Sequence, residues 1–298
     1  MSAGVLFDAP GPRARVRNAI LTAVSVVVLV AAVYFVYARF DAKGQWEGEL
    51  WKPFLEGSTW TEYIIPGLLG TLKAAGISAV CALIFGAVFG LARLSDHRWV
   101  RGVAGAVVET FRAIPLLLLI FFLFFLAPSV FGSGDYTLIA LVTGLTLYNG
   151  SVLAEIVRAG VRAVPIGQAE AAQAIGLRKS QMMRLVLLPQ AVTAMMPAIV
   201  SQLVVLLKDT ALGYIIAYVD LLNMGFKIIP AVYFGSLIPA AIVIGVIYVG
   251  LNMSLSALAT WLEKRTRRST RTAATPIAPP GFVGEPDSTG AGGVGAVA

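Results

Sequence analysis

The residues that could do chemistry are few and lie at the ends of apolar segments. Lys208, Asp209 and Thr210 follow one long apolar run, and Arg112 precedes another. Ionisable groups inside a membrane cost about 2.5–3.5 kcal/mol on insertion scales, so they suggest function by default. We expect these four residues to border a solute pathway, in which Lys208 could meet a substrate carboxylate. The alternative is that Lys208 and Asp209 only anchor a helix at the outer interface, because about 28 Å of helix separates them from Pro189.

Nucleophilic catalysis and metal binding have no support in the sequence. The chain holds one cysteine and one histidine. Cys81 lies within an apolar run and is interpreted as packing, and His97 lies in a basic loop where solvent exposure is favoured. The phosphate-binding pattern G-x-x-x-x-G-K-[S/T] does not occur, so the chain cannot cradle ATP in that way. We expect no catalytic residue, metal or cofactor here; ATP and Mg²⁺, if used, belong to a separate subunit.

The composition is typical of a polytopic membrane protein. Of the 298 residues, 58% are hydrophobic and 13% charged, and the mean hydropathy is +0.82. Soluble domains are about 45–50% apolar and about 25% charged. The net charge of +7 could suggest nucleic acid, but the basic residues are scattered at the ends of apolar runs. Such placement indicates membrane topology, so we expect an all-α membrane protein that binds no nucleic acid.

Six segments are long enough to span a membrane, which takes about 20 mostly apolar residues. The first is too long for a signal peptide and lacks a convincing cleavage site, so an uncleaved helix is predicted. Pro115 is expected to open the third span and Pro128 to close it. The segments comprise residues 18–38, 74–92, part of 113–133, 136–154, 185–207 and part of 228–262.

The charge distribution predicts the orientation. Six spans put both termini on one side, and most basic residues then lie in the inner segments, as the positive-inside rule requires. Residues 1–17 are therefore expected to be a basic cytosolic N-terminus, and the acid-rich, tryptophan-rich residues 39–63 an extracytoplasmic loop. Residues 263–298 are expected to be a cytosolic tail, basic and then disordered. The basic part could hold anionic lipid headgroups or simply stop transfer.

Small residues and charged pairs mark expected helix contacts. Gly86 and Gly90 form a small-xxx-small pair that permits close helix packing. Glu155 and Arg158 are i,i+3 neighbours that could pair and tie the fourth span to the segment after it. Glu109 and Arg112 have the same spacing at the start of the third span, so the same interpretation is applied to them.

A polar stretch at residues 162–188 separates the fourth and fifth spans. Pro165 predicts a helix start, residues 166–175 a short helix, and residues 179–188 a second one that leads to Pro189. Gly176 between them permits a turn with positive φ. Two short helices tied to spans at both ends could dock in a partner's groove and transmit its motion. An ordinary solvated loop is the plainer alternative.

This stretch resembles the signature of permease subunits of bacterial ABC importers. The pattern is Glu-Ala-Ala, three residues, Gly, nine residues, then aliphatic-x-Leu-Pro. It is matched by Glu170, Ala171, Ala172, Gly176, Val186, Leu188 and Pro189. The adjoining blocks "AEIVRAGVRAVPIGQAEAA", "LLKDTAL" and "FRAIPLLLLIFF" are similar to the branch that imports polar amino acids. Two departures lie near the expected pathway: Arg-Ala-Ile-Pro at 112–115 replaces the usual Arg-Gly-Thr-Pro, and Ala211 replaces serine.

The resemblance covers residues 64–262 and implies the type I ABC importer permease fold, with a five-helix core plus one extra N-terminal helix. It implies that the six signature residues other than Val186 couple to cytosolic ATP-binding subunits. It also implies a second permease subunit, an extracytoplasmic substrate-binding protein and a location in the bacterial cell membrane. The expected function is import of a polar amino acid, glutamate favoured, by alternating access.

Three alternatives remain open from the sequence. Glutamine or a basic amino acid could replace glutamate within the same importer class. A secondary transporter driven by an ion gradient would show an inverted repeat and midplane carboxylates, but no repeat is found. A membrane anchor or sensor without transport activity would leave the fit of residues 162–188 to the importer pattern unexplained.

Overall fold

The computed structural model describes residues 11–271, and within them every regular element is helical. Five helices are long and apolar enough to cross a membrane, or six if one bent pair counts as a single span. The elements in chain order are α1 (Pro12–Asp41), α2 (Gly48–Trp51), η1 (Lys52–Leu55), α3 (Gly57–Thr59), η2 (Trp60–Ile64), α4 (Ile65–Ala92), α5 (Arg98–Ala113), α6 (Leu116–Phe131), α7 (Thr137–Arg162), α8 (Ile166–Ala174), α9 (Lys179–Met182), η3 (Met183–Leu187), α10 (Leu188–Asp209), η4 (Thr210–Ile216), α11 (Leu221–Asn223), η5 (Met224–Ile228), α12 (Ile229–Val232) and α13 (Leu237–Arg271).

Helices α4 and α7 form the centre of the bundle, and small residues let them approach closely. The buried face of α4 consists of Gly67, Thr71, Ala74, Ser78, Ala82, Gly86 and Gly90. A Cβ on Gly86 would lie 2.6 Å from Cβ of Leu153, and one on Gly90 would lie 2.8 Å from the carbonyl oxygen of Ala154. The prediction that Gly86 and Gly90 lie on a buried face is confirmed.

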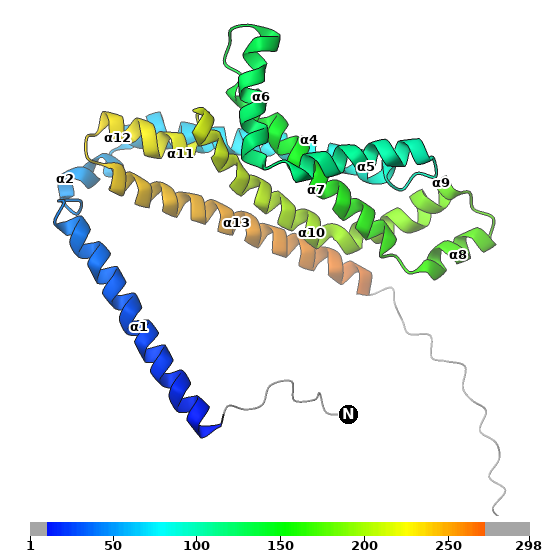
Figure 1. The fold of residues 1–298 in the computed structure, drawn as a ribbon, viewed down its shortest axis with the longest axis horizontal. Helices are drawn as coiled ribbons and strands as arrows, with labels where there is room; N and C mark the ends of the chain where they lie inside the picture. The colour runs from blue at the N-terminus through cyan, green and yellow to red at the C-terminus, as the bar shows by residue number, and fades with distance from the viewer. Residues whose placement is uncertain (1–10, 272–298) are drawn as a thin grey trace, which may run out of the picture.

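One helix, α6, lies within residues 113–133 and begins directly after Pro115, as predicted. The sequence did not indicate that α5 precedes it at an angle of 99°, and α6 stands out from the rest of the bundle (Figure 1). Pro115 causes the break, because proline cannot continue the hydrogen-bond ladder of α5 and holds the chain extended before α6 begins. Pro128 lies inside α6 rather than ending it.

Helix α10 packs against both α7 and α13, and these long helices run between two distinct ends of the molecule (Figure 1). The short helices α8 and α9 lie at one end, and α11 and α12 at the other (Figure 1). The chain breaks between α12 and α13, so the long apolar run 228–262 is divided, as its length requires. The polar hairpin and the segment after α10 are thus held at opposite ends of one bundle.

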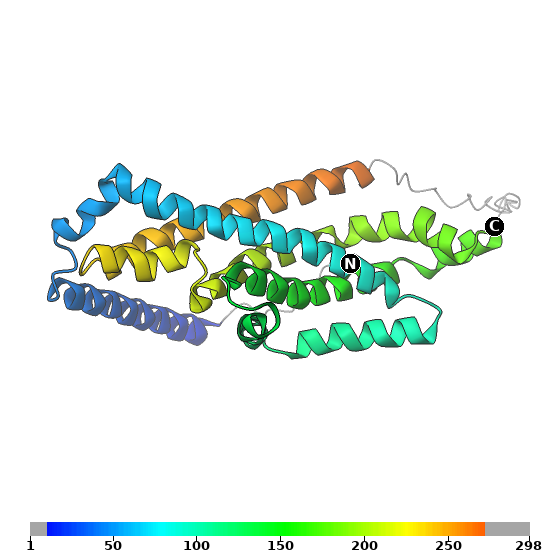
Figure 2. The same ribbon diagram turned by 90° about the horizontal axis from the view of Figure 1, so that it is seen from above.

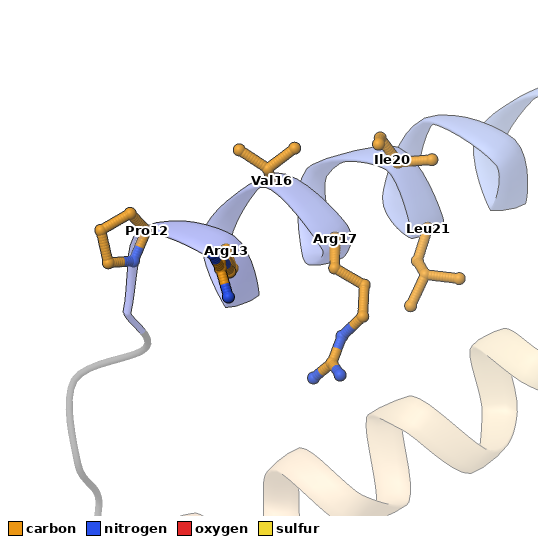
Figure 3. Close-up of a pocket in the computed structure, with 6 residues that line it drawn as sticks. All are labelled: Pro12, Arg13, Val16, Arg17, Ile20 and Leu21. Atoms are coloured by element: carbon orange, nitrogen blue, oxygen red, sulfur yellow. The ribbon is translucent and has the colours of Figure 1, made fainter.

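Helix α1 points away from the bundle in Figure 1, although it runs along the same direction as the other helices when seen from above in Figure 2, and it has no buried residue. It is joined to the core by aromatic stacking, in which Trp46 lies 5.4 Å from Tyr37 and 6.2 Å from Trp51 between ring centroids. The shallow groove at its start is lined by Pro12, Arg13, Val16, Arg17, Ile20 and Leu21, all from α1 itself (Figure 3). A helix apolar on all sides suits a lipid environment.

The ends of the chain only partly test the expected boundaries. Helix α1 begins at Pro12 and ends at Asp41, so it is longer than the expected span 18–38. Helix α13 continues to Arg271, so the expected tail 263–298 begins as helix. Residues 272–298, for which disorder was predicted, and residues 1–10 lie outside the described part of the chain.

Candidate functional site

The hairpin after α7 is a helix-turn-helix, as predicted, with one difference in its second half. Helix α8 is followed by Gly176 with φ of +80°, the left-handed conformation that favours glycine. The second helix was expected over residues 179–188, but α9 ends at Met182. The wider turn η3 then runs without a break into α10. Motion of the hairpin therefore passes directly into the axis of α10.

The signature residues divide into an exposed and a buried group. Glu170, Ala171, Gly176 and Pro189 are exposed, and Leu188 is half-buried. Ala172, expected to offer a slim surface to a partner, is instead 3% exposed. It packs in a cluster with Val161, Met182, Leu187 and Ala191. Ala172 is small because its own chain covers it, whereas Glu170 and Ala171 remain available to a partner.

Polar contacts attach the hairpin to the rest of the molecule. Lys179 pairs with Asp96 in the α4–α5 connection and donates to the carbonyl oxygen of Leu94 at 3.3 Å. The hydrogen bond from Lys179 lowers the pKa of the Asp96 carboxyl. On the other side, Gln190 of α10 donates to Gln168 of α8 at 3.2 Å. Polar contacts thus attach the hairpin to the α4–α5 connection as well as to α10.

An ion network joins the neighbouring ends of α4, α5 and α7. Arg93 bonds Glu155 at 2.8 Å and Glu109 at 2.9 Å. The predicted pairing of Glu155 with Arg158 is confirmed. The interpretation of Glu109 and Arg112 as a pair is wrong, because Arg93 reaches Glu109 from α4. Arg112 is exposed and adds positive charge around Glu155, so it belongs to this network and not to the surroundings of Lys208.

A second polar cluster lies between α7 and α10. Asn149 is fully buried; its amide nitrogen donates to Asp209 at 3.2 Å, and its amide oxygen accepts from Gln202 at 2.6 Å. Asn149 and Gln202 were not among the residues predicted for the pathway. The available signal was the presence of amides within the apolar runs of two adjacent spans, where they need partners.

The depth of Lys208 and Asp209 follows from their neighbours. Asn149, the partner of Asp209, follows Thr137 by twelve residues, or about 18 Å of helix. Tyr248, whose hydroxyl donates to the carbonyl oxygen of Lys208 at 3.1 Å, follows Leu237 by eleven residues, or about 17 Å. A hydrocarbon core is about 30 Å thick. Both residues therefore lie near mid-depth, because the first turns of α10 extend beyond the end of α7, and not at the outer interface.

The remaining predicted pathway residue, Thr210, is held internally. It is 1% exposed, and its hydroxyl donates to the carbonyl oxygen of Leu207 at 2.6 Å. Thr210 is the C-cap residue at which α10 passes into η4. The side chain of Lys208, in contrast, is exposed and lines a groove against α13. The four predicted residues thus form no single site: Lys208 and Asp209 lie together, Thr210 caps α10, and Arg112 lies elsewhere.

The segment from η4 to α12 folds back onto α4. A Cβ on Gly70 would lie 2.0 Å from the carbonyl oxygen of Val219, so only glycine fits. The hydroxyl of Tyr218 donates to the carbonyl oxygen of Gly70 at 3.0 Å, and Thr71 accepts from the amide of Leu221 at 3.0 Å. Ala217 adopts a positive φ of 60°. The segment is docked tightly at the cost of local backbone strain.

Asp220 lies in this docked segment, in the connection between η4 and α11 and outside the spanning helices. It is 1% exposed, and one carboxylate oxygen accepts from the amide of Asn223 at 2.7 Å. The other oxygen has no hydrogen-bond partner in the described structure. Burial raises the pKa of Asp220 to about 6, although nearby amides and Lys227 act in the opposite direction.

Among the side chains that the structure describes, no group of three or more His, Cys, Asp or Glu could hold a metal ion. Cys81 is a free, half-buried cysteine on α4. The polar features of the described chain are therefore the hairpin, the Arg93 network, the Asn149 cluster, the groove at Lys208 and the docked outer segment.

Comparison with known proteins identifies the family. The model described as "Binding-protein-dependent transport system inner membrane component" matches residues 82–268. The glutamate transport system permease protein GluD of Corynebacterium glutamicum is 44% identical over 229 residues, which cover 76% of this chain and 83% of GluD. The probable glutamine ABC transporter permease protein GlnP of Bacillus subtilis is 36% identical, over 68% of this chain and 93% of GlnP.

Solved structures agree with this assignment. A crystal structure of an amino acid ABC transporter with histidines has 31% identity and a TM-score of 0.63, covering 71% of this chain and 98% of that one. An inward-facing structure of the MetNI methionine ABC transporter, 19% identical, shares the fold with a TM-score of 0.60. The fold is that of type I ABC importer permeases. This chain belongs to the family of binding-protein-dependent transport system inner membrane components, the permease subunits of ABC importers for amino acids.

Proposed function

We propose that this permease imports glutamate, and that α10 converts the movement of its hairpin into opening and closing of the pathway. The observation that carries the proposal is the continuity of η3 and α10, which links the exposed hairpin to Lys208 and Asp209 at mid-depth. The helix is unbroken between them, and Pro197 lies inside it. A displacement of the hairpin therefore becomes a displacement of the polar cluster.

The exposed part of the hairpin is the proposed contact for a cytosolic ATPase subunit. Glu170 and Ala171 are exposed at the surface, while Ala172 fixes α8 to the core. A rigid element with an exposed face can receive a force and pass it on. ATP-driven closure of two such subunits would draw two hairpins together, open the pathway outward, and after hydrolysis return it inward.

Glutamate is proposed as the substrate on two grounds. The relative with 44% identity is named as a glutamate permease. In addition, Lys208 is an exposed cation near mid-depth, and none of the ion pairs between described side chains involves it. Asp209, the nearest acid in sequence, instead accepts from Asn149. A lysine that pairs with nothing at this depth can bind a substrate carboxylate.

The remaining components follow from the same proposal. Two ATPase subunits bind ATP and Mg²⁺, a second permease subunit completes the pathway, and an extracytoplasmic binding protein delivers the amino acid. Both termini lie in the cytosol in this proposal. The hairpin must face the cytosolic ATPases, and an even number of spans separates it from each end of the chain. The chain itself performs no catalysis and holds no cofactor.

The test is ATP hydrolysis by the complete complex in proteoliposomes, made with the ATPase and the binding protein. We expect glutamate to stimulate hydrolysis at least severalfold and to accumulate inside, and lysine or arginine to do neither. Stimulation by glutamine in place of glutamate would retain the importer and correct the substrate. Accumulation driven by an ion gradient without ATP would contradict the proposal.

A further inference from the structure

Two arginines at the start of α1 share one side of the helix. Arg13 and Arg17 are four residues apart and are therefore neighbours on the helix surface. They line a shallow groove of about 510 Å³ together with Pro12, Val16, Ile20 and Leu21 (Figure 3). Figure 3 shows the side chains of Arg17 and Leu21 projecting to the same side of α1. The groove thus combines two cationic groups with apolar side chains.

Helix α1 offers these arginines no counter-ion nearby. Its only acidic residue is Asp41 at the far end, about 40 Å away along the helix. Arg13 and Arg17 are exposed, and neither takes part in an ion pair between described side chains. Because α1 buries no residue against the bundle, the positive charge of the groove is open to an anion from outside the chain.

The position of the arginines along α1 matches the headgroup layer of a membrane. The charge-free run from Asn18 to Ala38 makes about 32 Å of helix, which fills a hydrocarbon core of about 30 Å. Arg17 therefore lies at the edge of this core, and Arg13 lies about 6 Å farther out. Ile20 and Leu21 lie just inside it. The groove thus extends from the level of the phosphates to the beginning of the acyl chains.

We propose that this groove binds an anionic phospholipid. Arg13 and Arg17 hold the phosphate, because guanidinium groups match the geometry of phosphate oxygens, and Ile20 and Leu21 contact the acyl chains. The lipid fastens the start of α1, whose other end is joined to the core by the stacking of Trp46. This inference goes beyond the proposed function: it rests on the place of α1 in the membrane and not on the transported amino acid.

Arg15 separates a binding groove from general attraction. A basic helix end near an anionic membrane surface is attracted through all of its charges. Arg15 is also exposed, but it is two residues from both Arg13 and Arg17 and therefore lies on the other side of α1. General attraction uses the three arginines alike, whereas the groove uses only Arg13 and Arg17.

The test is quenching of a fluorophore on α1 by brominated lipids in the complete complex. The permease carries Cys81→Ala, which removes its one cysteine, and is assembled with cysteine-free partner subunits. Bimane is attached at Val24→Cys, four residues after Ile20 and on the side of the groove. The vesicles are phosphatidylcholine with an equal fraction of either dibrominated phosphatidylglycerol or dibrominated phosphatidylcholine, whose bromine atoms quench a bimane that they touch.

The matched control for the fluorophore is Val26→Cys, two residues farther on and on the other side of α1. The native valines are 54% and 53% exposed, so the two positions differ in side and hardly in exposure. We expect brominated phosphatidylglycerol to quench at least threefold more effectively than brominated phosphatidylcholine at Val24→Cys, and both lipids to quench equally at Val26→Cys. Equal quenching by both lipids at Val24→Cys would overturn the proposal.

Arginine variants assign the preference to the groove. Arg13→Gln with Arg17→Gln should abolish the preference for phosphatidylglycerol at Val24→Cys, whereas Arg15→Gln should retain it. These variants are expected to fold, because the substituted side chains are exposed and α1 buries no residue. A loss of preference with Arg15→Gln as large as with the double variant would show general attraction and contradict a binding groove.

Inorganic phosphate identifies the source of the anion. Replacing chloride by phosphate at equal ionic strength should leave the preference at Val24→Cys unchanged, because free phosphate makes no contact with Ile20 and Leu21. Loss of the preference would show that the groove takes phosphate from solution, and the assignment to a lipid would be wrong. Glutamate-stimulated ATP hydrolysis of the same complexes is measured separately, so its failure corrects the proposed function and leaves the lipid result standing.

Discussion

The two ends of α10 are built in different ways. At the hairpin end, Glu170 and Ala171 are exposed, a Cβ on Gly176 would meet nothing within 4 Å, and exposed polar pairs provide the fastening. At the other end, Asn149, Thr210 and Asp220 are buried, and the segment after α10 leaves no space at Gly70. An open end can accept a partner, whereas a closely packed end can change only between discrete arrangements.

The largest effect is expected at the packed end, from Gly70→Ala. The new Cβ would lie 2.0 Å from a backbone oxygen of the docked segment. Overpacking costs typically about 1–3 kcal/mol and occasionally more, so we expect a loss of about 3 kcal/mol or more in the free energy of unfolding, with no transport. Thermal melting measures the loss of stability, and glutamate uptake measures the loss of transport.

The matched control is Gly245→Ala on α13, where a Cβ would meet nothing within 4 Å. There the higher helix propensity of alanine should be neutral or stabilising by up to about 1 kcal/mol. Equal stability and uptake for the two variants would mean that the segment is not docked on α4 as described.

Asp220→Asn should give the next largest effect, and it should depend on pH. The pKa of Asp220 is raised to about 6 in the folded protein from an ordinary 3.8. A raised pKa means that this carboxyl contributes fully to stability below about pH 4, and that the contribution is lost as pH rises through 6. The difference corresponds to roughly 2–3 kcal/mol. We expect Asp220→Asn to melt higher than wild type at pH 7.5 and to lose that advantage by pH 4.

Parallel melting curves of the two proteins from pH 4 to pH 7.5 would contradict this expectation. Lys227 is the charged residue that acts on Asp220 to lower its pKa. Lys227→Met should therefore move the pH range of the wild-type transition upward, which provides an internal check on the assignment to Asp220.

At the open end, Gly176→Ala should have a moderate effect. Nothing would clash with the new Cβ, so the cost comes only from φ of +80°, about 1–2 kcal/mol for a residue other than glycine. We expect a small change in overall melting but a severalfold loss of amino-acid-stimulated ATP hydrolysis, because the hairpin no longer holds its angle. Gly167→Ala on α8 is the control, because a Cβ there also meets nothing within 4 Å and Gly167 has no positive φ. The ATP hydrolysis of this variant should remain stimulated by the amino acid.

The smallest effect is expected from the contact between Lys179 and Asp96. Their side chains are 43% and 74% exposed, and exposed ion pairs contribute little to stability. Lys179→Glu should reduce amino-acid-stimulated ATP hydrolysis by less than twofold at low salt. The charge swap Lys179→Asp with Asp96→Lys should restore this stimulation. A loss as large as that of Gly176→Ala would mean that the α4–α5 connection carries more of the force than α10.

The same contrast explains what could be predicted from the sequence. The hairpin was predictable because Pro165, Gly176 and Pro189 act on their own backbone, and the spans because apolar length is a local property. The 99° bend at Pro115 was missed, since proline indicates a break but not its angle. The partners of Asn149 and Gln202 depend on how α7 and α10 pack. Pairwise spacing also assigned Glu109 to Arg112, when Arg93 from α4 is the partner.

The central claim, that α10 joins an ATP-driven hairpin to a solute pathway, is tested most directly by the amount of glutamate imported per ATP hydrolysed. The measurement compares Asp209→Ala with Gly176→Ala in proteoliposomes. We expect Asp209→Ala to retain stimulated hydrolysis but import several times less glutamate per ATP, and Gly176→Ala to lose the stimulation itself. If Asp209→Ala loses stimulation as Gly176→Ala does and its import per ATP is unchanged, the two ends do not have separate roles and the claim is wrong.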